Sequence, residues 1–311
     1  MLGIIIAISS ALFMAGMYIL LKKSYKELDP SVAFFFDAIF GLIIWIPIGF
    51  IFGAKVSEIS QTFVYAIISA ILSEAFVFYA LSKGNLSVAL TLISTYPMFT
   101  LIFSFLINGE LLTIPQLLFV IVAIIGIILT CIEKEFTFSA FKKPVILIPT
   151  LAAVAIGLSD TLTKQIINET SSFSFLVSLA IVQVPVALIY LKISKQSIKK
   201  TFTEMVIKKE DVNVEMDKSL DTVTHTHTHK YIVREYGYGI LGSLLNIIAT
   251  GLLLISFNYT MASIASPLTA MYTAIVLVYA FAFMKEKVSR INGVGIVLTF
   301  IGSFGIIILG G

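Results

Sequence analysis

The sequence predicts an all-α polytopic membrane protein with ten transmembrane helices arranged as two inverted five-helix repeats. Three observations support this fold class. Hydrophobic residues make up 58% of the 311 positions and charged residues 13%, about half of the roughly 25% charged residues of a soluble domain. The charges are concentrated, with eight Lys/Arg and six Asp/Glu between positions 195 and 234. The remaining sequence consists of long apolar segments, and these segments repeat.

The apolar segments are long enough to span a bilayer, which takes about 20 residues per helix. Backbone groups in hydrocarbon must be paired within the segment, so the spans are expected to be helical. The first is expected to be a span rather than a cleaved signal peptide, because it has no basic leading region. The ten predicted spans are residues 2–21, 31–53, 61–81, 85–107, 112–132, 145–167, 172–194, 236–257, 260–284 and 291–310.

The repeat becomes visible when the chain is aligned with itself. An offset of 176 residues aligns the end of the third span through the fifth with the end of the eighth through the tenth, without a gap. The matched pairs are Ser87 with Ser263, Ala89 with Ala265, Leu92 with Leu268, Tyr96 with Tyr272, Phe105 with Phe281, Glu110 with Glu286 and Gly126 with Gly302.

A second offset, 141 residues, aligns the first two spans with the sixth and seventh. It pairs Gly16 with Gly157, Lys23 with Lys164 and Phe34 with Phe175. The difference between the offsets falls in the polar stretch 195–233, which is too charged to fold alone. We therefore expect a first repeat over 1–132, a connector over 133–144, and a second repeat over 145–310 that the loop 195–233 interrupts. Five spans is an odd number, so the repeats are inverted, as in many secondary transporters.

Several short motifs recur in the two halves. The first half contains Gly16, Lys22-Lys23, Leu28-Asp29-Pro30, Tyr79-Ala80-Leu81, Ala89, Tyr96-Pro97, Gly109-Glu110, Gln116 and Gly126. The second contains Ala265-Ser266-Pro267-Leu268, Tyr272, Lys285-Glu286-Lys287, Gly295 and Gly302. Together they resemble the EamA-type ten-helix members of the drug/metabolite transporter superfamily. The resemblance implies a carrier of small organic metabolites. The sequence differs from many members early in the second span, where it has Asp37 instead of an Arg.

Few ionisable residues lie inside the predicted spans, and such residues are functional candidates because they are costly in a bilayer. Glu74 lies near the middle of the third span, and its repeat partner Thr250 shares a helical stripe with Asn246. A carboxyl group at this depth is suited to carrying a proton. The alternative is a packing role, with Glu74 hydrogen-bonded to neighbouring Ser and Tyr residues.

For the other ionisable residues in the predicted spans, the sequence favours structural roles. Asp160 and Lys164 are four residues apart with the acid first, which predicts an intrahelical ion pair. The alternative is that both residues line the substrate cavity. Asp37 lies six residues into its span and is expected to reach the lipid headgroups. Glu110 and Glu286 lie at helix ends, where a carboxylate can accept hydrogen bonds from free backbone N–H groups.

Polar residues without charge could line a cavity between the repeats. Pro97 lies inside the fourth span, where a proline permits a bend. Gly3, Ala7, Ala11 and Ala15 form a stripe of small residues, which is typical of a close helix contact. The candidate cavity residues are Thr91, Ser94, Thr95, Tyr96, Asn246, Thr250, Ser266, Thr269 and Tyr272.

All histidines of the chain lie in one segment, at His225, His227 and His229. In an extended strand this spacing would place the three imidazoles on one side, as a weak candidate for a divalent metal site. A low-complexity loop without a metal would look the same. The resulting alternative function is a divalent metal-ion carrier with a His-rich regulatory loop.

The function that we expect is secondary transport of a small organic metabolite, amino acid-like or drug-like, by alternating access, with possible proton coupling. Enzyme activity is not expected, because no HExxH motif, intramembrane histidine or aspartate pair is present. No cofactor is expected either. The expected partners are a small-molecule substrate and the lipid bilayer, not nucleic acid, and the protein is expected to act as a monomer or homodimer in the plasma membrane.

The orientation in the membrane is open at this stage. Lys and Arg concentrate in the odd-numbered loops, which predicts that these loops are cytoplasmic and that both termini are outside. The family resemblance implies the reverse, with both termini in the cytoplasm.

Overall fold

The computed structural model describes residues 1–25, 28–81, 89, 92–131, 144–197, 223–284 and 289–309. These residues are predominantly helical, and no strand is present among them. Eight of the described helical segments are long and apolar enough to cross a membrane, and the two shorter apolar helices Tyr96–Asn108 and Ile114–Thr130 accompany them. The predicted fold class, an all-α polytopic membrane protein, is therefore confirmed.

The first half of the chain forms five spans, the third of which is built from three consecutive pieces and the fourth of which is described mainly by α6. The elements are α1 (Leu2–Ser24), α2 (Pro30–Ile51), α3 (Val56–Ser69), η1 (Ala70–Ala75), α4 (Phe76–Leu81), α6 (Tyr96–Asn108) and α7 (Ile114–Cys131). The second half forms α8 (Pro144–Glu169), α9 (Ser172–Ile193), α11 (Val223–Ser256), α12 (Ala262–Ala270), α13 (Tyr272–Met284) and α14 (Arg290–Ile308).

Local sequence signals explain several of the helix ends. Asp29 caps α2 by accepting hydrogen bonds at Oδ1 from the backbone N–H (2.8 Å) and the hydroxyl (2.6 Å) of Ser31, and Pro30 occupies the first turn. Ser171 and Ser289 cap α9 and α14 in the same way. Gly109 ends α6 in the left-handed conformation, with φ of 65°. These are residues that favour helix ends because they satisfy or release the terminal backbone groups.

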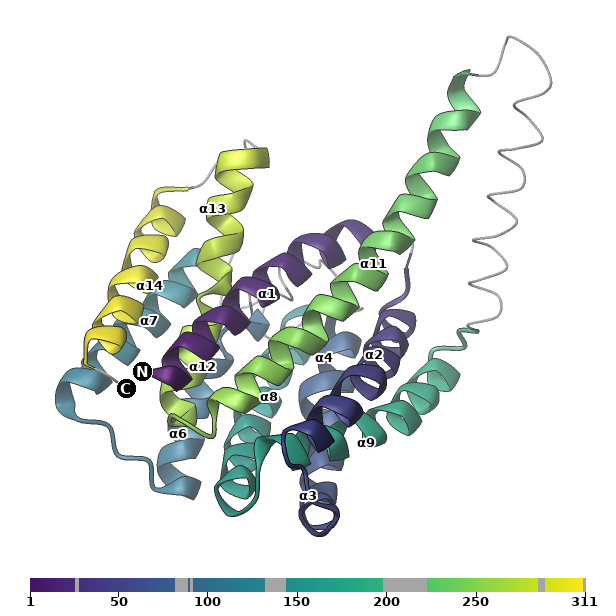
Figure 1. The fold of residues 1–311 in the computed structure, drawn as a ribbon. Coiled ribbons are helices and arrows are strands. Elements are labelled where there is room, and N and C mark those ends of the chain that lie inside the picture. The colour runs from purple at the N-terminus through teal and green to yellow at the C-terminus, as the bar shows by residue number, and fades with distance from the viewer. Residues whose placement is uncertain are drawn as a thin grey trace.

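The packing of the helices follows the predicted repeat. In Figure 1, α1 lies along α11, and α2 lies beside α9. The equivalent of the α1–α11 contact in the other half is the contact of α8 with α3, η1 and α4. Helices α7 and α14 are also paired. Each of the pairs α2–α9 and α7–α14 joins an element to its own repeat partner, as a twofold pseudosymmetry axis requires.

In the pair α7–α14, equivalent residues of the two repeats make equivalent contacts. An added Cβ on Gly126 would lie 2.3 Å from the backbone nitrogen of Thr299, and one on Gly302 would lie 2.4 Å from the backbone nitrogen of Ala123. The offset of 176 residues pairs Gly126 with Gly302 and Ala123 with Thr299. The same close approach of two backbones is therefore built twice, once from each repeat.

Three details differ from the sequence predictions. The third span begins at Val56 instead of residue 61 and changes to a π-helix at Ala70. The ninth predicted span is divided at Met271 into α12 and α13. Helix α11 begins at Val223, so residues 223–233 are helical where a loop was expected.

The helical start of α11 also corrects the arrangement expected for the histidines. An extended strand would align His225, His227 and His229, but the backbone there is helical. The strand geometry on which the metal hypothesis depended is therefore wrong.

Candidate functional site

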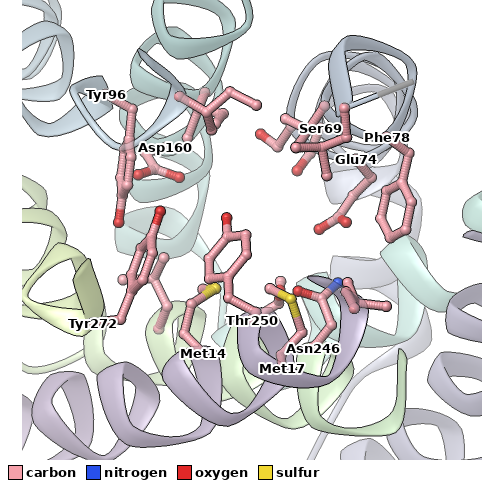
Figure 2. A pocket seen from close by; sticks show the side chains of 18 of the residues that line it. Met14, Met17, Ser69, Glu74, Phe78, Tyr96, Asp160, Asn246, Thr250 and Tyr272 are labelled. Atoms are coloured by element: carbon pink, nitrogen blue, oxygen red, sulfur yellow. The ribbon is translucent and has the colours of Figure 1, made fainter. Parts of the chain in front are cut away.

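A buried cavity of about 90 Å³ lies between the two halves of the bundle. Figure 2 shows Tyr96, Asp160 and Tyr272 on one side of it and Ser69, Glu74 and Phe78 on the other. Residues of α1 and α11 close a third side. Both repeats therefore contribute walls to one cavity.

Glu74 lies in the π-helix η1, with its carboxyl group directed into the cavity (Figure 2). Its side chain is buried, with 6% exposed. A π-turn inserts an extra residue into an α-helix, rotates the following side chains and is frequent at functional sites. Its repeat partner Thr250 lines the same cavity from α11, which continues through this position as an α-helix. The π-turn therefore makes the two halves unequal where they face each other.

Asp160, on α8, provides a second buried carboxyl group in the cavity, with 5% exposed. Its Oδ2 accepts a hydrogen bond from the Ser266 hydroxyl at 2.9 Å. The backbone carbonyl of Ser266 accepts a longer one, at 3.3 Å, from the Tyr96 hydroxyl. Ser266 therefore links a carboxyl group and a tyrosine that both line the cavity.

Asn246, which lines the cavity, is hydrogen-bonded to the buried residue Asp37. The Nδ2 group of Asn246 donates a hydrogen bond to Oδ1 of Asp37 at 3.0 Å, and Asn246 also interacts with Glu74. Asp37 is fully buried, and its Oδ2 has no hydrogen-bond partner among the residues that the structure describes. The carboxyl group of Glu74 interacts electrostatically with those of both Asp37 and Asp160. The expectation that Asp37 reaches the headgroups is wrong.

Two repeat-related helix breaks lie beside the cavity. Helix α6 begins at Tyr96, directly after a turn at Ser94 and Thr95, and α13 begins at Tyr272, directly after a turn at Met271. The two tyrosines are repeat partners, and both line the cavity. Discontinuous helices near the middle of the membrane are typical of substrate sites in secondary transporters.

One end of the bundle is held by a second set of polar contacts. The Glu110 carboxylate caps α12, accepting hydrogen bonds from the backbone N–H groups of Ala262 (3.0 Å) and Ser263 (2.9 Å) and from the Ser263 hydroxyl (2.5 Å). Lys164 donates a hydrogen bond to the carbonyl oxygen of Phe257 at the end of α11. The turn between α11 and α12 is therefore attached both to the first half, through Glu110, and to α8.

The family model of EamA-like transporters matches residues 1–132 and 143–308. The chain belongs to the EamA-like transporter family. Members of this family are membrane transporters of small molecules, and the helices of this chain are those of an integral multi-pass membrane protein. The resemblance found in the sequence is thereby confirmed.

Two further comparisons accompany the family match. A solved crystal structure aligns with a TM-score of 0.69 at 13% identity, covering 99% of this chain and 96% of that one, which supports the fold. An uncharacterized protein of Methanocaldococcus jannaschii is 42% identical over 73 residues, which is 22% of this chain and 53% of that protein. The match thus spans about half the length of this curated relative.

Within this EamA-like chain, most of the sequence candidates converge on the cavity. Those that line it are Glu74, Tyr96, Asp160, Asn246, Thr250 and Tyr272. Ser266 supports Asp160 from behind, as described above. Pro97 and Ser94 are buried at the start of α6 and just before it. Thr91 and Glu286 lie outside the described residues, and so do the side chains of His225, His227 and His229.

The predicted ion pair between Asp160 and Lys164 does not form. Asp160 is directed to Ser266 and the cavity, whereas Lys164 is directed to Phe257. Two strong partners on neighbouring elements outweigh the small gain of about 0.2–0.5 kcal/mol from an i, i+4 pair on one helix. Spacing along the chain could not reveal these partners.

Helix α1 contributes cavity residues that were not predicted from the sequence. Met14, Met17 and Tyr18 line the cavity, and the ring of Tyr18 stacks on that of Tyr272 with centroids 4.5 Å apart. The small residues Ala7, Ala11 and Ala15 are buried, in agreement with the close contact expected of them. The spacing of Met14, Met17, Tyr18 and Leu21 along one helical face was a signal for a second, cavity-facing stripe.

Proposed function

We propose that the protein is a proton-coupled secondary transporter of the plasma membrane that works by alternating access, as a monomer or homodimer. The central cavity is the substrate site in this proposal. The observation that carries it is the convergence of two buried carboxyl groups on one cavity: Glu74 from the first repeat and Asp160 from the second.

The charge of the cavity supports proton coupling. Among the described lining residues there is no Lys, Arg or His. The titratable groups that face Glu74 are Asp160 from α8, Asp37 from α2 and Tyr18 from α1. A buried carboxylate without a cationic partner is costly, and binding a proton removes that cost. Substrate entry and proton release at Glu74 would then be coupled through the same small space.

The polar contacts at one end of the bundle support alternating access. Lys164 holds the turn after α11, whereas its repeat partner Lys23 lies over the ring of Tyr238, with Nζ 5.5 Å from the centroid. Partners in an inverted repeat occupy different environments in any one state and exchange them when the transporter changes state. Opening at this end requires the Glu110 and Lys164 contacts to break.

No specific observation favours the metal-ion carrier. Among the residues that the structure describes, no group of three or more His, Cys, Asp or Glu is arranged to hold a metal ion.

Proton coupling can be tested in proteoliposomes that contain a pH-sensitive dye. A panel of amino acids, amines and nucleosides is added outside, one at a time, and dye fluorescence reports proton movement. At least one probe should drive proton movement with the parental protein. Glu74→Gln, which keeps the size and removes the titrating group, should abolish it. Glu169→Gln, at an exposed position of α8, is the matched control and should retain it. An unchanged proton response in Glu74→Gln would contradict the proposal.

A further inference from the structure

We propose that the substrate is a small organic monocation, an amine with a compact apolar body, whose ammonium group binds between Glu74 and Asp160 while its body lies against the Tyr18–Tyr272 pair. This inference rests on the proposed function, because it assigns a substrate class to the same cavity.

The acidic groups that face the cavity favour a positively charged substrate. Glu74 and Asp160 face the cavity from opposite sides (Figure 2), and Asp37 lies behind them. The described residues Lys164 and Lys23 do not line the cavity and contact other groups, Lys164 the Phe257 carbonyl and Lys23 the Tyr238 ring. A carboxylate or phosphate substrate would meet like charges, and no Lys, Arg or His among the described lining residues would offset them, which is unfavourable between buried groups. An ammonium group would compensate them.

The rest of the cavity wall is aromatic and apolar, which suits the organic part of such a substrate. Two stacked tyrosine rings and the thioethers of Met14 and Met17 line the cavity beside the carboxyl groups. Aromatic faces attract organic cations, and methionine adapts to apolar bodies of different shapes. A dehydrated Ca²⁺ or Mg²⁺ would instead need about six oxygen ligands around it. The wall therefore favours an organic cation over a metal ion.

The volume of the cavity favours a small substrate. The cavity has a volume of about 90 Å³, several times the roughly 10–15 Å³ that one water molecule needs. A space of this size favours a compact amine over a bulky polycyclic molecule. An amino acid would fit in length, but its carboxylate would face the acidic side chains.

The inference is tested by calorimetric binding to the purified full-length protein in detergent, at constant pH and salt. The probes are four molecules of similar shape and different charge: benzylamine, benzoate, phenylglycine and benzyl alcohol. Benzylamine should bind at least about thirtyfold more tightly than the other three, the effect expected when a desolvated charge gains or loses its partner. This comparison uses the parental protein and does not depend on the folding of a variant.

Variants then locate the site. Glu74→Gln and Asp160→Asn should each weaken benzylamine binding about thirtyfold or more, and Glu169→Gln should leave it unchanged. Benzoate or phenylglycine binding as tightly as benzylamine, or no benzylamine binding, would overturn the inference. Such a result would leave proton coupling intact if another probe drives proton movement in vesicles. Conversely, benzylamine binding without proton movement for any probe would refute the coupling and keep the substrate class.

Discussion

Replacing Gly126 or Gly302 by alanine should destabilise the contact between α7 and α14. The added methyl group would lie 2.3 Å from the backbone nitrogen of Thr299 in the first case and 2.4 Å from that of Ala123 in the second. Ordinary contacts of a Cβ begin near 3.4 Å, so the helices would have to separate by about 1 Å. A backbone nitrogen cannot rotate away as a side chain can. We expect each substitution to cost about 1–3 kcal/mol, as for other overpacked interiors.

The matched control is Gly293→Ala on α14, because an added Cβ there meets nothing within 4 Å. This variant should be neutral or more stable, since alanine favours a helix over glycine by about 1 kcal/mol. The measurement is the Tm of the purified protein in detergent. The double variant Gly126→Ala/Gly302→Ala should lose less than the sum of the single losses, because both methyl groups push the same two helices apart. Equal Tm values for Gly126→Ala and Gly293→Ala would refute the reasoning.

Two further predictions concern one end of the bundle and the orientation of the chain. Glu110→Gln removes one carboxylate oxygen from the hydrogen bonds with Ala262 and Ser263, so we expect a loss of about 1–3 kcal/mol and a lower Tm than for Glu169→Gln; similar Tm values would show that the capping contact contributes nothing. A tag after Gly311 should be digested by protease added to intact cells, if the charge distribution sets the topology. Digestion that requires opening the membrane would place both termini in the cytoplasm.

Much of the cavity could be predicted because polar and ionisable residues in a membrane-spanning helix have a high free-energy cost in lipid, which identifies them in the sequence. A carboxyl group in the middle of an apolar helix, such as Glu74 or Asp160, is too expensive to persist in lipid, so burial in the protein follows from the sequence alone. The repeat then relates Tyr96 to Tyr272 and Glu74 to Thr250, residues that face the cavity from both halves. The fold class follows from the same argument, because apolar segments of about 20 residues must be helical in a bilayer.

Other features depend on which elements meet in space. The sequence placed Asp37 near the headgroups, but α11 brings Asn246 to its carboxyl group across 209 positions of the chain. The π-turn at Glu74 was not predicted from the sequence, because such turns are rare single-turn insertions within otherwise α-helical segments.

The sequence by itself determined the fold class, the apolar segments and the carboxyl groups within them, and it predicted the inverted repeat. These follow from short-range rules, because the transfer of each side chain and backbone group into hydrocarbon has a cost that depends on that group and its near neighbours. Only the tertiary structure decided that Asp160 pairs with Ser266 instead of Lys164, and that Tyr18 stacks on Tyr272 beside Glu74. Partners in such contacts lie far apart in the chain. Their selection depends on the close packing of whole helices, which no local pattern encodes.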